Sequence, residues 1–163
     1  MKKRYLVGLL LVAGIFALFA GLNAKEHQNL PPAEAEAFWT YITEENPYEQ
    51  WEFFPGYDGM YPGKSPHGAF LKLYANEIAI EAAKAGKPMP NGAILVKENY
   101  GENQKDLMAI TPLYKKQGYN PEAGDWYWAK YGPDGSVETS GKVDSCIQCH
   151  KAAPENMRFS QAR

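Results

Sequence analysis

Short segments of the chain alternate apolar and polar residues in the way that half-buried strands do. Four such strands are predicted, at 69–75, 92–99, 107–114 and 125–131. A fifth is predicted at 136–140, because the Gly-Pro-Asp-Gly sequence just before it favours a hairpin turn. Pro112 lies within the third strand and cannot donate a backbone hydrogen bond, which indicates an edge or a bend.

Other segments carry apolar residues at helical spacing. Residues 32–45 and 77–85 are predicted helices, the second of them capped by Asn76. A short helix near the carboxyl end is predicted to be capped by Asp144 or Ser145. Helices and mostly antiparallel strands together predict an α+β fold, with a five-stranded antiparallel sheet, flanking helices and a C-terminal helix.

A long irregular loop is predicted at 51–68, where glycine and proline recur too often for a regular element. Long loops in compact domains are often functional. An alternative is that the loop only anchors Trp51, Phe53 and Phe54 in the core, and both interpretations stay open.

The amino-terminal segment has the layout of a secretory signal peptide. A basic start at 1–4 precedes an uncharged apolar run at 5–22, and Ala24 provides a small residue at a cleavage site. The alternative is an uncleaved membrane anchor, since the run is just long enough to span a bilayer. Both interpretations place a single domain, 25–163, outside the cytoplasm, in the periplasm.

The composition narrows the class of protein. The chain has 163 residues, of which 45% are hydrophobic and 22% charged, as expected for one globular domain. Its net charge of −2 gives no sign of nucleic-acid binding. Two cysteines are too few for a disulfide framework.

Both cysteines belong to a Cys-x-x-Cys-His sequence formed by Cys146, Cys149 and His150, which is the signature of covalent c-type haem attachment. On a helical turn, residues three apart point to the same side, so two thiols can meet one porphyrin. A redox dithiol would be expected in a βαβ unit, and a zinc site needs more ligands. The sequence therefore predicts one covalent haem c, with His150 as the iron ligand.

The other side of the iron has few candidate ligands. Met157 is too close to His150 to reach the opposite face, and His27 lies in the polar leader. His67 lies in the glycine-rich loop and is the remaining histidine. We predict a five-coordinate iron with an open site, which favours small-molecule binding over simple electron transfer. Ligation by His67 is the alternative.

At this point several segments together resemble the cytochrome P-460 family, which includes the β-sheet cytochromes c′. The resemblance implies an antiparallel sheet, one C-terminal haem held by Cys146, Cys149 and His150, and commonly a homodimer. The segments are Ser-Pro-His-Gly at 65–68, Gly-Ala-Ile-Leu-Val-Lys-Glu-Asn-Tyr at 92–100, Gly-Tyr-Asn-Pro at 118–121, Gly-Asp-Trp-Tyr-Trp-Ala-Lys at 124–130 and Gly-Lys-Val at 141–143.

The resemblance also singles out Lys97. In members that oxidise hydroxylamine, a lysine at the end of a Val-Lys-Glu strand is covalently joined to the porphyrin, and Lys97 matches it. Other members bind nitric oxide or carbon monoxide without that bond. Strand alternation allows Lys97 to face inward with Leu95, or to be solvated while Ile94 and Val96 face inward.

Three functions follow from these residues. The first is an exported mono-haem protein that binds a diatomic gas such as nitric oxide. The second is a hydroxylamine or nitric oxide oxidoreductase with a Lys97–haem cross-link; it is weakened because the place of the family's distal carboxylate falls at 107–109, which holds no acid. The third is a six-coordinate cytochrome that passes electrons to a redox partner protein.

Overall fold

The computed structural model describes residues 30–151, so the predicted signal peptide or anchor at 1–24 lies outside the described residues. The helices are α1 (Ala35–Thr40), α2 (Glu77–Lys84) and α3 (Asp144–His150). Short turns of other helix types occur at Tyr41–Glu45, Tyr48–Gln50 and Pro121–Ala123. Within this part of the chain, no helix is long and apolar enough to span a bilayer.

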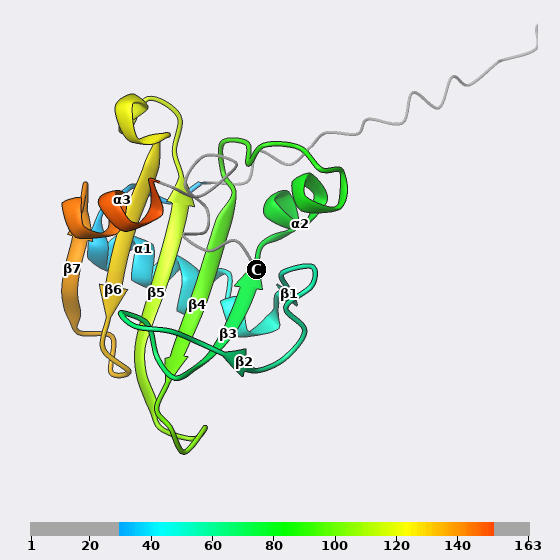
Figure 1. Ribbon diagram of the computed structural model, residues 1–163. Coiled ribbons are helices and arrows are strands. Elements are labelled where there is room, and N and C mark those ends of the chain that lie inside the picture. Colours follow the sequence, from blue (N-terminus) through cyan, green and yellow to red (C-terminus); the bar gives the residue numbers. More distant parts are fainter. Residues whose placement is uncertain (1–29, 152–163) are drawn as a thin grey trace, which may run out of the picture.

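All strands belong to one antiparallel sheet (Figure 1). Along the sheet the order is β1-β3-β4-β5-β6-β7, and β2 also pairs with β3. The strands are β1 (Glu52–Phe53), β2 (Tyr61–Pro62), β3 (Phe70–Ala75), β4 (Ile94–Tyr100), β5 (Leu107–Lys115), β6 (Trp126–Tyr131) and β7 (Val137–Gly141). The α+β class and the antiparallel sheet are confirmed.

The predicted strand count was too low, because the loop at 51–68 contributes the two-residue strands β1 and β2. Of the two interpretations of Pro112, an edge or a bend, the edge is wrong, since β5 lies between β4 and β6. There Pro112 pairs with Val96 of β4, while the pairing with β6 is interrupted between Ile110 and Leu113. Pro112 has no backbone N–H to donate, and the break in the pairing of β5 with β6 allows it to lie inside the sheet.

The predicted helices are confirmed with changed ends. The helix at 32–45 is α-helical only over Ala35–Thr40 and continues as a π-helical turn to Glu45. Asn76 caps α2 as predicted, and its side chain accepts a hydrogen bond from the Ala79 N–H at 3.1 Å. Helix α3 starts at Asp144, but its cap position is Val143, without a side-chain cap, so the predicted capping by Asp144 or Ser145 was wrong.

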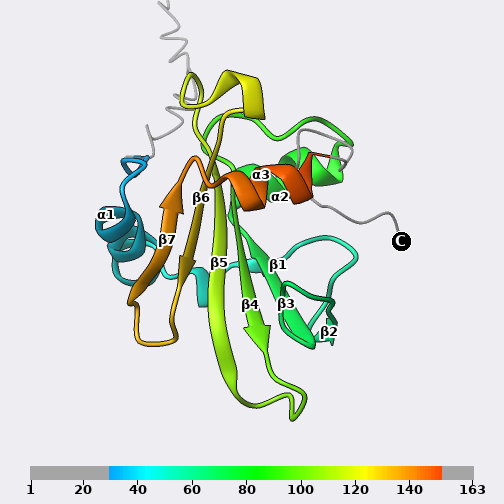
Figure 2. The same ribbon diagram turned by 60° about the vertical axis from the view of Figure 1, so that its left-hand side comes forward.

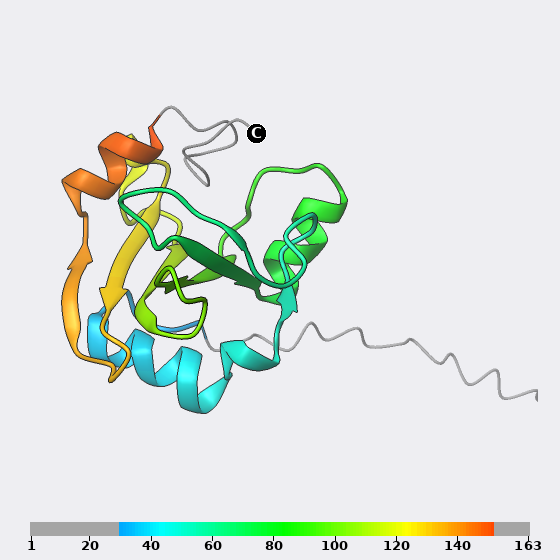
Figure 3. The ribbon, with the colours of Figure 1, turned by 60° about the horizontal axis from the view of Figure 1, so that its bottom comes forward.

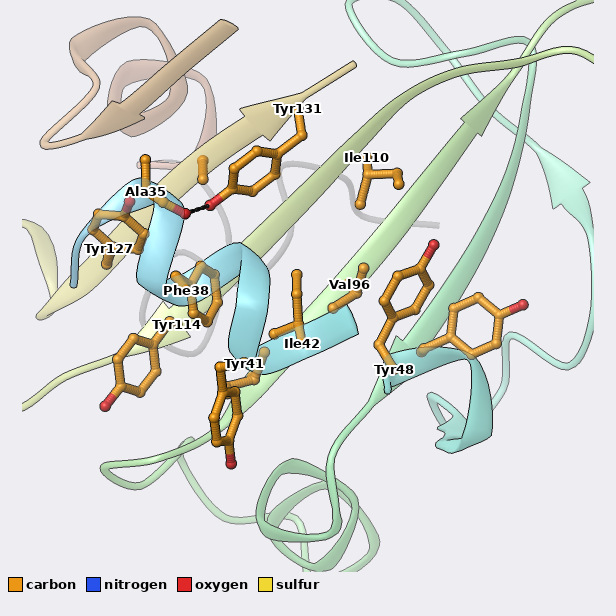
Figure 4. Close-up of a cluster of buried hydrophobic side chains, with 13 residues drawn as sticks. Ala35, Phe38, Tyr41, Ile42, Tyr48, Val96, Ile110, Tyr114, Tyr127 and Tyr131 are labelled. Carbon is orange, nitrogen blue, oxygen red and sulfur yellow. Dashed lines mark hydrogen bonds between the residues drawn. The ribbon is translucent and has the colours of Figure 1, made fainter. Parts of the chain in front are cut away.

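Helices cover both faces of the sheet. Helix α1 lies on one face, and α3 lies on the other (Figures 2 and 3). On the first face, Phe38 and Ile42 pack against the sheet, and the Tyr131 hydroxyl donates to the Ala35 carbonyl at 2.8 Å (Figure 4). On the second face, residues of α2 and α3 join a separate cluster around Trp126 and Trp128. Each face therefore has its own core.

Strand β4 is buried on both faces. Ile94 and Val96 belong to the core beneath α1, whereas Leu95 belongs to the core on the α2 and α3 side. Glu98 also lies on the α1 side and is 4% exposed. A buried carboxylate is costly unless it is hydrogen-bonded.

Three tyrosines supply those hydrogen bonds. The hydroxyls of Tyr100, Tyr48 and Tyr74 donate to the Glu98 carboxylate at 2.7, 3.0 and 3.5 Å. The Lys72 ammonium lies 3.6 Å from it. Burial and the hydrogen bond to Glu98 raise the pKa of Tyr100, so its phenol remains a donor. This cluster joins β3, β4 and the turn after α1.

Replacing Tyr100 by Phe removes the shortest of these hydrogen bonds. Because the acceptor is a buried carboxylate, we expect the free energy of unfolding to fall by about 1.5–3 kcal/mol. Urea denaturation measures it. Tyr119→Phe is the control, since the Tyr119 ring packs on Tyr127 and its hydroxyl makes no hydrogen bond within 30–151. Equal losses in the two variants would contradict the role of Glu98.

Candidate functional site

A cavity of about 540 Å³ opens on the sheet face away from α1. Strands β4, β5 and β6 form its floor, and α3 and the loop before β3 form its walls. Its lining includes every residue that the sequence singled out for haem chemistry: Cys146, Cys149, His150, Lys97 and His67. Segments that are far apart in the sequence therefore meet at one place.

The register of β4 and β5 orders the cavity floor in three levels. Leu95 pairs with Leu113, Lys97 with Thr111, and Asn99 with Ala109, and all of these line the cavity. Cys146 packs into the cluster that contains Leu95 and Leu113. Lys97 therefore lies on the middle level, and Asn99 lies on the level furthest from α3.

Helix α3 brings the two cysteines and His150 to the cavity. Cys146 and Cys149 are free thiols, the first half-buried and the second exposed. Burial raises the pKa of the Cys146 thiol. His150 ends the helix and is 6% exposed. Its ring packs edge-on against Trp128, with ring centroids 4.8 Å apart, so the wall of the cavity orients the imidazole.

Lys97 faces the cavity. Because Ile94 and Val96 pack beneath α1, alternation along β4 turns Lys97 to the opposite face, where it lines the cavity beside Leu95. Of the two orientations that the sequence left open, the structure shows the inward one. Burial lowers the pKa of the Lys97 ammonium to about 8. The neutral amine, which is the nucleophilic form, is thus accessible near physiological pH.

His67 lies in the same cavity, in the loop before β3. Its Nδ1 is 3.0 Å from the Asn99 Oδ1 atom. Its ring centroid is 6.2 Å from that of His150, with the two rings almost perpendicular. Burial, followed by the positive charge of Lys97, lowers the pKa of His67 to about 4. The imidazole is therefore neutral at neutral pH.

Close backbone packing holds the His67 loop against β4. A Cβ atom on Gly68 would lie 2.4 Å from the Tyr100 carbonyl oxygen and 2.6 Å from the Tyr100 nitrogen. The Gly68 N–H donates to Asn99 Oδ1 at 3.3 Å. Only glycine permits this approach, and the approach places His67 beside Asn99.

The described lining is mostly apolar, and its charged side chains are all positive. Lys97 and Lys130 are its charged residues, and no carboxylate belongs to the described lining. Glu98 faces α1, and Asp106 lies in an exposed turn, so neither replaces the missing acid at 107–109. The sequence has no acidic residue at 107–109, and the described cavity wall has no carboxylate either.

These features fit a haem group. The flat apolar macrocycle of haem would pack against the hydrophobic wall. Its two carboxylates would find opposite charge on Lys97 and Lys130. The Trp128 Nε1–H is buried and has no hydrogen-bond partner among the described residues. Cys146, Cys149 and His150 would hold the haem and its iron.

The sequence analysis missed Asn99, Trp128 and Lys130. Asn99 shares strand parity with Lys97, so alternation alone signals that it faces the same side. Trp128 lies in the segment 124–130 that carries the family resemblance but was given no role, and it both packs in a core cluster and lines the cavity. Lys130 shares strand parity with Trp128, so alternation puts the two on one face, but only the pairing of β6 with β5 brings that face to the cavity.

The family model for cytochrome P460 matches residues 45–158, and the chain belongs to the cytochrome P460 family. It is therefore a haem-binding cytochrome. No curated protein shows significant similarity to the chain. The matched residues span the sheet, the cavity and the Cys-x-x-Cys-His sequence.

Gly68→Ala tests the packing of the His67 loop. The added methyl group must displace the backbone of β4, so we expect the free energy of unfolding to fall by about 1–3 kcal/mol. Gly101→Ala is the matched control, because a Cβ atom there has its nearest neighbour at 3.8 Å. Urea denaturation of the haem-loaded proteins measures both. A loss in Gly101→Ala as large as that in Gly68→Ala would count against this packing constraint.

Proposed function

We propose that the chain is an exported mono-haem c-type cytochrome whose iron binds a small ligand, such as nitric oxide, opposite His150. The observation that carries this proposal is that both thiols and His150 line one largely apolar cavity. Bound haem would supply an iron that takes a ligand. The described part of the lining holds no carboxylate, which favours binding over proton-removing catalysis.

Each residue then has a defined role. The Cys146 and Cys149 thiols form the thioether bonds, and the His150 imidazole binds the iron. Trp128 restrains the orientation of His150 by ring contact. Lys97 and Lys130 provide positive charge for the haem carboxylates. In this proposal bound haem would have a five-coordinate iron, which would leave one position open to a small ligand.

Export to the periplasm, by a cleaved signal peptide or an uncleaved anchor, belongs to this proposal because c-type attachment takes place outside the cytoplasm. A homodimer is proposed from the family resemblance alone. A redox partner protein is required only if the iron changes oxidation state during function.

Replacing both cysteines by Ser tests covalent attachment. We expect haem to remain with the denatured wild-type chain on a gel, detected by its peroxidase stain, and to be lost from Cys146→Ser/Cys149→Ser. His150→Ala is the control: it removes the iron ligand but keeps both thioether bonds, so its denatured chain stays stained. A stained double variant would contradict c-type attachment through these thiols.

The absorption spectrum of the purified haem-loaded protein tests the open position. A high-spin spectrum that changes on adding nitric oxide or carbon monoxide supports the proposal. Sharp low-spin bands that resist both gases would contradict it. They would favour the electron carrier instead, with His67 as the sixth ligand; the short separation of the His67 and His150 rings is the observation behind that alternative.

The second candidate is an oxidoreductase acting on hydroxylamine or nitric oxide, with Lys97 cross-linked to the haem. The specific observation is that Lys97 lines the cavity with its pKa lowered to about 8. A strongly red-shifted reduced Soret band in the wild type, lost in Lys97→Ala, would establish the cross-link. Lys130→Ala is the control, since it removes the other cavity lysine. Identical spectra of wild type and Lys97→Ala would exclude the cross-link.

A further inference from the structure

We propose that Tyr100 and Glu98 form a redox-active pair that returns an electron to haem oxidised by hydrogen peroxide. As the electron leaves the Tyr100 ring, the proton of its hydroxyl passes to the Glu98 carboxylate. Such a pair adds a second activity to ligand binding, the removal of oxidising equivalents from the haem. Peroxide must reach an open position on the iron, so this inference rests on the proposed function.

Glu98 is a buried carboxylate outside the haem site, because it faces α1 whereas Lys97 and Asn99 face the cavity. Its neighbours on that side of β4, Ile94 and Val96, are apolar. An apolar side chain at this position would pack without the cost of burying a charge. Packing alone therefore does not require a carboxylate here, whereas a proton acceptor for the surrounding phenols does.

Of the three phenols that donate to Glu98, Tyr100 has the shortest hydrogen bond, at 2.7 Å. A phenol that loses an electron while keeping its proton leaves a positive charge on its ring. The Lys72 ammonium lies 5.2 Å from the centre of the Tyr100 ring and makes that charge costly. The electron therefore leaves more readily when the proton moves to the adjoining carboxylate. Burial and the hydrogen bond to Glu98 raise the pKa of Tyr100, so the proton does not leave beforehand.

Tyr100 lies next to the cavity while its ring is kept away from the solvent. Asn99, the residue before it on β4, lines the cavity, and consecutive Cα atoms are about 3.8 Å apart. Gly68, another lining residue, packs on the Tyr100 backbone, where a Cβ atom would lie 2.6 Å from the Tyr100 nitrogen. The ring points to the opposite face with Glu98 and is 9% exposed. One layer of backbone thus separates the phenol from the cavity, which an electron can cross and peroxide cannot.

Electrons and protons balance in this step. Reduction of one hydrogen peroxide to two waters breaks the O–O bond and consumes two electrons from the haem and two protons from the solvent. Tyr100 returns one electron to the haem and becomes a neutral phenoxyl radical. Its O–H bond breaks, and the proton converts the Glu98 carboxylate into a neutral carboxylic acid. An external one-electron reductant such as ascorbate restores the radical and the remaining oxidising equivalent of the haem.

Electron paramagnetic resonance tests the pair in the haem-loaded ferric protein, frozen rapidly after mixing with hydrogen peroxide. We expect a tyrosyl radical in the wild type and its loss in Tyr100→Phe. Tyr114→Phe is the matched control, since Tyr114 is another buried tyrosine beneath α1, and its hydroxyl bonds to no carboxylate within 30–151. An undiminished radical in Tyr100→Phe, or an equal loss in Tyr114→Phe, would overturn the proposal.

Glu98→Gln tests the proton acceptor by the same measurement. The amide has nearly the shape of the carboxylate but is a far weaker base. Because a positioned base contributes a large factor to the rate of proton removal, we expect the radical to form about a hundredfold more slowly. Radical formation at the wild-type rate would show that the proton goes elsewhere and would overturn the pair.

The wild type alone tests the pair if a variant does not fold. After full exchange into deuterium oxide, the group that moves to Glu98 is a deuteron, so the radical should form more slowly. Electron–nuclear double resonance should then detect one deuteron hydrogen-bonded to the phenoxyl oxygen, donated by the new carboxylic acid. A radical with no such deuteron and no isotope effect on its formation would overturn the proposal.

Failure of the pair is distinguishable from failure of the proposed function. If neither nitric oxide nor hydrogen peroxide changes the absorption spectrum of the haem-loaded wild type, the iron has no open position and both fail. If nitric oxide binds but peroxide either leaves the haem unchanged or produces no radical on Tyr100, only the redox role of Tyr100 and Glu98 is wrong.

Discussion

Strand β4 imposes the constraint on which the rest of the structure depends, because both of its faces are buried and alternate residues must suit different surroundings. Ile94, Val96 and Glu98 point beneath α1. Leu95, Lys97 and Asn99 point into the cavity. A shift of one residue in register would exchange the two sets, burying Lys97 under α1 and exposing Glu98 to the cavity. The hydrogen bonds from three tyrosines to Glu98 oppose such a shift and so keep the cavity side in place.

How much could be predicted depends on whether a feature is local. The Cys-x-x-Cys-His sequence is contiguous, so spacing alone was enough to select its residues as candidates. The α+β class followed from periodicity. The strands β1 and β2 were not predicted, because two residues are too few to show the alternation of apolar and polar positions. Both strands are defined by their pairing with β3. The place of Pro112 depended on strand order, which alternation does not contain.

The orientation of Lys97 is a further case. Alternation offered two choices, and each satisfied the sequence because the strand is apolar on both sides. Only the packing of α1 against Ile94 and Val96 decides between them. The same packing brings Asn99 into the cavity, although no motif marks it. A single sequence therefore does not reveal the role of residues whose position depends on strand register and packing rather than on the spacing of a motif.

Asn99 links the stability of the fold to the chemistry of the site. Its amide satisfies backbone groups of β4, β5 and the loop that carries His67, so it belongs to the sheet as much as to the cavity. Because so many partners hold the Asn99 side chain, it has one orientation. Its Oδ1 atom in turn orients the His67 imidazole, whose Nδ1 lies 3.0 Å away. The orientation of the His67 ring therefore depends on hydrogen bonds that the sheet needs in any case. His67 can therefore be replaced without leaving buried backbone groups unpaired, whereas replacing Asn99 would leave carbonyl groups of β4 and β5 without this partner.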